Sequence, residues 1–254
     1  MTARSFSSIG WFLASLAFTI LLLLAWEGIA NMRLVPRAFL PAPSLAFQAL
    51  WDGLVGGSLA YKTLLTLERM FYGWLVASLA GVALGTVIGI SATARAYIAP
   101  TLELFRPLPV SAIIPVAIAF LGLSEGMVLT VIGFGALWPV LLATIHGYSS
   151  IEPRLIEVSK ALNMSRVQMI YKIGLPSVLP DVIAAMRISI TIALILAVVC
   201  EMLTGYDGLG HELLNSARAF RSAEMFAVIF ILSFIGYLTA AALDFAERWS
   251  WRHR

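Results

Sequence analysis

The longest stretch of the chain without a charged residue is GMVLTVIGFGALWPVLLATIHGYSSI, residues 126–151. A helix needs about 20 apolar residues to cross the hydrocarbon core of a bilayer, and this stretch is longer than that. It therefore predicts a transmembrane α-helix and sets the fold class as that of an integral membrane protein.

Similar apolar stretches lie on both sides of it. We predict an all-α fold of about six transmembrane helices, at residues 11–30, 70–92, 98–122, 127–147, 182–204 and 224–245. The first has no small-residue cleavage site after its apolar stretch, which favours a membrane span over a signal peptide.

The composition supports the same class and excludes several others. Of 254 residues, 60% are apolar and 12% are charged, with a mean hydropathy of +0.92, whereas an ordinary soluble domain has about 25% charged residues. This excludes a soluble enzyme, a disordered chain and a coiled coil. The net charge is +3, but the basic residues are scattered and form no nucleic-acid patch. Cys200 is the single cysteine, so neither an internal disulfide nor a cysteine-based metal site is expected.

Six spans place both termini on one side of the membrane. Basic residues are more numerous on that side, and cytoplasmic segments are enriched in Lys and Arg. We therefore expect cytoplasmic termini, with residues 148–181 as the longest cytoplasmic loop. The sequence has no evident linker or repeat, so residues 1–254 are expected to form a single transmembrane domain with its core at about 60–247.

The pattern within this loop predicts two helices separated by a kink. Pro153 suits the first turn of a helix over 154–162, and Asn163 suits the left-handed conformation that ends one. Ser165 and Gln168 have the spacing of a capping box. We expect the second helix to end at Gly174, before two prolines that turn the chain toward the bilayer. Its apolar face indicates either a helix lying flat on the membrane surface or a docking surface for a cytoplasmic protein.

The same loop resembles the EAA loop of ATP-binding-cassette (ABC) importer permeases. The resemblance lies in the spacing of Glu157, Asn163, Ile173, Leu175 and Pro176. Val158 and Ser159 replace the two alanines of that pattern, and Asn163 replaces its glycine. By this resemblance, the residues that couple the chain to an ATPase are Glu157, Val158, Ser159, Ala161, Leu162, Asn163, Ser165, Ile173, Leu175 and Pro176.

The resemblance covers roughly residues 40–247 and is to the nitrate, sulfonate, taurine and bicarbonate branch of these permeases. The other motifs that carry it include Leu40-Pro41-Ala42-Pro43-Ser44, Arg106-Pro107-Leu108-Pro109, Trp138-Pro139, Glu201-Met202 and Gly208-Leu209-Gly210. It implies a type I ABC importer permease fold, with a cytoplasmic helix–kink–helix coupling loop, in the inner (plasma) membrane of a bacterium. The implied solute is small and anionic. An importer of another organic solute, such as an aromatic acid or a vitamin precursor, is the alternative, and a secondary transporter or channel that needs no ATPase is a lesser one.

The partners that this resemblance implies lie outside the chain. They are a second copy of the permease, two cytoplasmic ABC ATPase subunits, an external or periplasmic substrate-binding protein and the lipid bilayer. A Walker A motif requires Gly-Lys, and none of the three lysines, Lys62, Lys160 and Lys172, follows a glycine. We expect no cofactor in this chain, with ATP and Mg bound by the partner ATPase.

No catalytic or metal site is expected. Gly122-Leu123-Ser124-Glu125-Gly126 matches the nucleophile-elbow pattern, but that motif has meaning only at a strand-to-helix turn, and here it lies between two spans. The three histidines, His146, His211 and His253, lack metal-ligand spacing.

Two further sets of residues are expected to act within the bundle. Small residues recur every four positions in the second span, which permits close helix packing, within the chain or between copies; its glycines are Gly73, Gly81, Gly85 and Gly89. Ionisable or helix-breaking residues inside spans indicate a transport pathway, and the candidates are Arg106, Pro109, Arg187 and Glu201.

Overall fold

The computed structural model describes residues 3–32, 35–105 and 107–251, which form helices and no strand. The elements are α1 (Ala3–Asn31), α2 (Pro43–Val55), α3 (Leu59–Gly89), α4 (Ala92–Phe105), α5 (Val110–Leu121), α6 (Glu125–Ser149), α7 (Pro153–Ala161), α8 (Arg166–Met169), a π-helical turn (Ile170–Gly174), α9 (Leu175–Thr204), α10 (Leu209–Arg218) and α11 (Ser222–Trp251). The all-α membrane fold expected from the sequence is confirmed.

Within the described ranges, five helices are long and apolar enough to cross a membrane, or six if one bent pair is a single span. The bent pair corrects the span predicted at 98–122: it consists of α4 and α5, which meet at an angle of 92°. Pro107 and Pro109 lie between the two helices, and Pro109 is the N-cap residue of α5. A proline inside a continuous helix would remove a backbone hydrogen bond and clash with the preceding turn, which accounts for the break here. In place of the third predicted span the chain has this bent pair, which forms a broken span or a re-entrant loop and starts earlier than expected, at Ala92.

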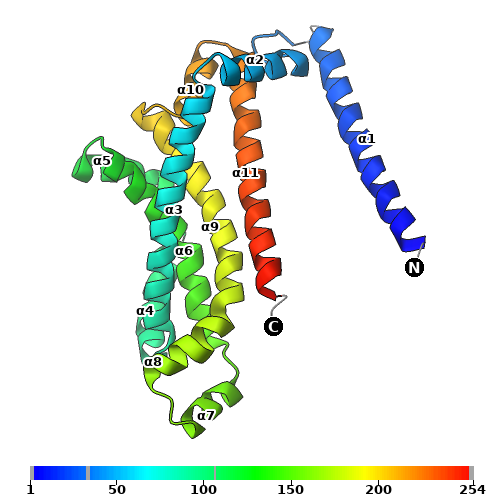
Figure 1. Cartoon of the computed structure of the whole chain (residues 1–254). Helices are drawn as coiled ribbons and strands as arrows, with labels where there is room; N and C mark the ends of the chain where they lie inside the picture. Colours follow the sequence, from blue (N-terminus) through cyan, green and yellow to red (C-terminus); the bar gives the residue numbers. More distant parts are fainter. Residues whose placement is uncertain (1–2, 33–34, 106, 252–254) are drawn as a thin grey trace.

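The bundle is built around α3, α6 and α9, with α11 beside α9 (Figure 1). The glycines of α3 allow the closest approach. A Cβ atom at Gly73 would lie 2.5 Å from Ile132 Cγ2, and one at Gly85 would lie 2.5 Å from Thr144 Cβ. Gly81 and Gly89 face α6 in the same way, so the small-residue ridge packs within the chain.

Most of the first helix lies apart from this bundle (Figure 1), although near its end the Trp26 ring packs against Phe226 of α11, with ring centroids 5.3 Å apart. Its final turns contact the start of α2: the Trp26 indole N–H donates to the Pro41 carbonyl over 3.0 Å, and Glu27 accepts from the backbone N–H of Ser44 over 3.1 Å. None of its most apolar window is buried within the chain. The sides of α1 are therefore available to lipid or to another chain.

The bundle has two ends that differ in construction. We call the end formed by α2 and α10 the α10 end, and the opposite end, formed by α7 and α8, the α7 end (Figure 1). The start of α1 and the finish of α11 both point toward the α7 side. The helices thus have the topology predicted from the sequence, in which the two termini and the long loop share a side.

Candidate functional site

The loop at the α7 end has the local structure predicted from its sequence. Helix α7 begins at Pro153 and ends at Ala161, and Asn163 has a positive φ of 49°. Ser165 and Gln168 form the expected capping box: the Ser165 hydroxyl accepts from the Gln168 N–H over 3.2 Å, and the Gln168 side chain accepts from the Ser165 N–H over 2.9 Å. These contacts fix the start of α8.

Much of this loop is exposed. Glu157 is exposed, and Val158, Leu162 and Val167 are 49%, 63% and 62% exposed. Ser159 is the exception, because it is buried and its hydroxyl donates to the Ile156 carbonyl over 2.7 Å. Ala161, Asn163 and Ser165 are also exposed. A short helix pair that projects from the bundle with apolar side chains exposed is suited to bind another surface.

The sequence predicted that the second helix of the loop ends at Gly174, and this prediction is wrong. It continues through the π-helical turn into α9, so that residues 166–204 form one long helix. The Leu175 N–H donates to the Ile170 carbonyl, five residues back. This wider turn precedes Pro176, which has no N–H to donate, so the proline is accommodated without ending the helix. Ile173, one of the predicted coupling residues, is partly buried in this turn. Because the helix continues into α9, the loop outside the bundle is shorter than the predicted loop at residues 148–181.

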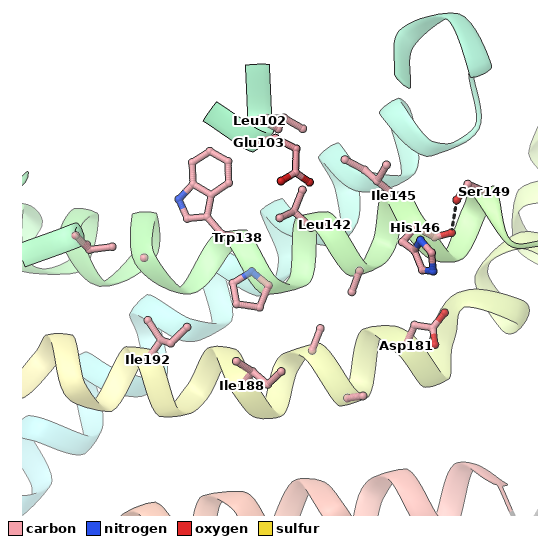
Figure 2. A pocket seen from close by; sticks show the side chains of 16 residues that line it. Leu102, Glu103, Trp138, Leu142, Ile145, His146, Ser149, Asp181, Ile188 and Ile192 are labelled. Carbon is pink, nitrogen blue, oxygen red and sulfur yellow. Dashed lines mark hydrogen bonds between the residues drawn. The ribbon is translucent and has the colours of Figure 1, made fainter. Parts of the chain in front are cut away.

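A pocket of about 870 Å³ lies between α6 and α9, beside the end of α4. Its lining is mainly apolar, and its ionisable side chains among the described residues are Glu103, His146 and Asp181 (Figure 2). His146 and Asp181 lie at the same end of the pocket (Figure 2). Glu103 points into the pocket from α4 (Figure 2). Val110, next to the predicted pathway residue Pro109, also lines it. Arg106 lies outside the described residues.

The other two predicted pathway residues lie elsewhere. Arg187 turns away from this pocket toward α11, where it forms an ion pair with Asp244. Glu201 is fully buried near the α10 end, where both carboxylate oxygens accept hydrogen bonds. In this chain both residues connect helices to one another.

Glu201 belongs to a buried polar cluster whose centre, Arg69, was not singled out from the sequence. Arg69 Nη1 donates to Glu201 Oε1 over 2.9 Å and to the Asp207 carbonyl over 2.6 Å. Its Nη2 and Nε donate to Glu125 over 2.7 and 3.0 Å. The hydroxyl of Thr66 donates to Glu201, over 2.9 Å to Oε2, and accepts from the Leu209 N–H over 2.9 Å. This cluster ties α3, α6, α9 and α10 together.

The glycines of the Gly208-Leu209-Gly210 motif lie against the same carboxylate. A Cβ atom at Gly208 would lie 2.2 Å from Glu201 Cδ, and the Gly210 N–H donates to Glu201 Oε2 over 2.9 Å. An acid inside a predicted span indicates a basic partner at the same depth. That rule could have identified Arg69 before the structure was known.

The nucleophile-elbow pattern has a structural role. Ser124 is the N-cap of α6, and its hydroxyl accepts from the Met127 N–H over 3.1 Å. The segment joins α5 to α6, so it has none of the strand-to-helix geometry that the catalytic motif requires.

These features define a class: a multi-pass α-helical membrane protein with a broken helix beside a pocket and a helical loop projecting from one end. Comparisons with known proteins identify the family. Residues 77–252 match the family model of the binding-protein-dependent transport system inner membrane component, and the chain belongs to this family.

Named relatives place it in the sulfonate, taurine, nitrate and bicarbonate branch. The chain is 25% identical to the taurine transport system permease protein TauC of Escherichia coli over 89% of this chain and 84% of that protein. It is 29% identical to the nitrate import permease protein NrtB of Leptolyngbya laminosa over 71% of this chain and 64% of that protein.

A solved structure has the same fold. A chain from the inward-facing MetNI methionine ABC transporter superposes with a TM-score of 0.64 at 19% identity, covering 83% of this chain and 98% of that one. The fold is that of a type I ABC importer permease.

Proposed function

We propose that this chain is the permease subunit of an ATP-driven importer, and that its α7–α8 loop receives the force of ATP hydrolysis from a separate ATPase. The observation that carries this proposal is the projecting loop, which exposes Glu157 and Asn163 at the EAA-like spacing. The chain has no Walker A motif, so the nucleotide site belongs to the partner.

The orientation follows from charge. Arg154, Lys160, Arg166 and Lys172 gather in and beside the α7–α8 loop, and cytoplasmic segments of membrane proteins are enriched in such residues. We therefore assign the α7 end and both termini to the cytoplasm of a bacterial cell. The α10 end then faces outward, where a binding protein delivers the solute.

The proposed solute is a small anion or sulfonate, in keeping with the relatives named for taurine and nitrate transport. The pocket between α6 and α9 is our candidate for one wall of the pathway, and a second copy of the chain supplies the other. Its ionisable lining in the described residues includes two carboxylates, Glu103 and Asp181, which do not select for anions. Selectivity is therefore assigned to the external binding protein.

A charge reversal tests the coupling role directly. The substitution Glu157→Lys is made in the complex purified with its ATPase and reconstituted in liposomes, and phosphate release is measured with and without loaded binding protein. We expect the binding protein to lose its stimulation of phosphate release, because Glu157 is exposed on the surface that is proposed to contact the ATPase. Asp52→Lys, an equal charge change at an exposed position of α2 at the opposite end, is the control: the ATPase should still co-purify with it, and its phosphate release without binding protein should match the parent. Unchanged stimulation in Glu157→Lys would show that the docking assignment is wrong.

A further inference from the structure

Tyr148, near the end of α6, occupies the point where three elements meet. It is 6% exposed. A Cβ atom at Gly89, the last residue of α3, would lie 2.8 Å from Tyr148 Cβ, and one at Gly174, in the π-helical turn, would lie 2.7 Å from Tyr148 Cε1. The side chain therefore fills the space between the end of α3 and the start of α9, and only glycine fits on either side of it.

The turn that Tyr148 contacts is where we place a hinge. π-helical turns inside longer helices are frequent at functional sites, and this one separates α8, in the loop, from α9, in the bundle. Pro176 removes the hydrogen bond that would stiffen the next turn. A mainly apolar pocket of about 560 Å³, lined by Thr86, Ile170 and Val178 among others, leaves space beside the hinge.

The apolar cluster around Tyr148 is separate from the main core of the bundle. Its buried members are Val140, Tyr148, Val178, Val182 and Ala185, from α6 and α9. Val178 occupies the notch left by Gly147, since a Cβ atom there would lie 2.6 Å from Val178 Cγ1. The contact of α6 with α9 and the π-helical turn at this end thus includes two interlocked pairs, Val178 with Gly147 and Tyr148 with Gly174.

We propose that Tyr148 is a positioning residue for transport. When the α7–α8 loop is displaced, the π-helical turn bends, and Gly174 pushes on the Tyr148 ring. The ring passes this displacement to α6, which carries it, and to α3 through Gly89. Because α6 and α9 together form the pocket, the pocket changes shape. This inference rests on the proposed function, since it assumes that an ATPase moves the loop.

The test uses three variants that change one contact. Gly174→Ala adds a methyl group against Cε1, Cζ and the hydroxyl oxygen of Tyr148. Tyr148→Leu removes those ring atoms and leaves a gap. The double variant places the new methyl group in that gap. Gly133→Ala, where the nearest atom would be 3.9 Å away, is the matched control.

The readout is the accessibility of the pocket. Ile188 lines the pocket and is 58% exposed, so the parent protein carries Ile188→Cys together with Cys200→Ala, which removes the buried natural thiol. The complex with its ATPase is reconstituted in liposomes. The maleimide labelling rate at position 188 is measured with and without Mg-ATP and vanadate, alongside phosphate release.

We expect each single variant to keep phosphate release within about twofold of the parent while the ATP-dependent change in labelling falls roughly tenfold. Retained phosphate release shows that the single variants fold and bind the ATPase, and the double variant should recover most of the labelling response. Parental responses in both single variants, or a double variant worse than either, would overturn the role of Tyr148. If no ATPase binds the parent, or if ATP leaves its labelling unchanged, the proposed function itself fails before any variant is made.

Discussion

The two ends of the bundle are held together by different interactions. At the α10 end, Arg69 and Glu201 are buried and joined by short hydrogen bonds that link four helices. At the α7 end, Tyr148 packs against Gly89 and Gly174, and the loop beyond it is largely exposed. Buried ion pairs have demanding geometry and lose much energy when one partner is removed, whereas packed apolar contacts exchange neighbours more readily.

This difference indicates where movement can occur. A bundle that is fixed at one end and adjustable at the other changes shape mostly at the adjustable end. Both α6 and α9 extend from the buried charge cluster to the α7 end, so a displacement of the loop is converted into a change in their spacing along the pocket. Substitutions at and between the two ends test whether the α10 end is the fixed one.

The largest effect is expected from Arg69→Met. This change leaves Glu201 buried without its cation, and breaking a buried pair in this way costs about 3–5 kcal/mol. Thermal unfolding of the purified protein in detergent should show a strongly lowered midpoint. Arg218→Met, an exposed arginine on α10, is the control. A midpoint equal to that of the control would mean that the cluster does not stabilise the α10 end.

Local patterns predicted the α7 end better than the α10 end. Asn163 and the Ser165–Gln168 capping box act over a few residues, so their spacing alone specifies their conformation. The contact between Arg69 and Glu201 joins positions 132 residues apart, and no local pattern encodes which distant partner a buried acid finds. Arg187 was assigned to the pathway from its depth in the span, but only the structure shows that it turns toward Asp244.

Two backbone features were also beyond the sequence pattern. Pro176 predicted an interruption, yet the chain accommodates it with a wider turn instead of a break, and the distant residue Tyr148 packs against Gly174 in that turn. Helix α10 was not predicted from the sequence. It is short and packs along one face on α9 and α11, so it has no long apolar run that would have indicated it. Both outcomes depend on tertiary contacts that override local preference.

An intermediate effect is expected from Gly85→Ala, in the ridge between the two ends. The added methyl group would lie 2.5 Å from Thr144 Cβ and 2.9 Å from the Leu141 carbonyl oxygen. Overpacking of this kind costs about 1–3 kcal/mol, so the unfolding midpoint should fall less than in Arg69→Met. Gly126→Ala, with its nearest atom 3.8 Å away, should leave the midpoint unchanged. Equal midpoints in the two alanine variants would refute the close α3–α6 packing.

A smaller and local effect is expected from Asn163→Ala. Asn163 has a φ of 49°, and the left-handed region costs a residue with a side chain roughly 1–2 kcal/mol, a cost that asparagine partly avoids. Hydrogen exchange in α7 should speed up while the unfolding midpoint of the bundle stays the same. In Asn163→Gly, hydrogen exchange in α7 should be as slow as in the natural protein or slower. A lowered global midpoint would show that the α7 end does not open independently.

The smallest effect is expected from Ser165→Ala, which removes one half of the capping box. The Gln168 N–H then loses its acceptor, a change worth about 1 kcal/mol at a helix N-terminus. Because α8 continues through the π-helical turn into α9, fraying should spread from Arg166 toward Gly174 and stop where Tyr148 supports the turn. Hydrogen exchange resolved to single residues tests this, and Ser165→Thr, which keeps the hydroxyl, is the control. Faster exchange that extends beyond Leu175 would mean that Tyr148 does not anchor the start of α9, and the contrast between the two ends would then involve the whole length of that helix.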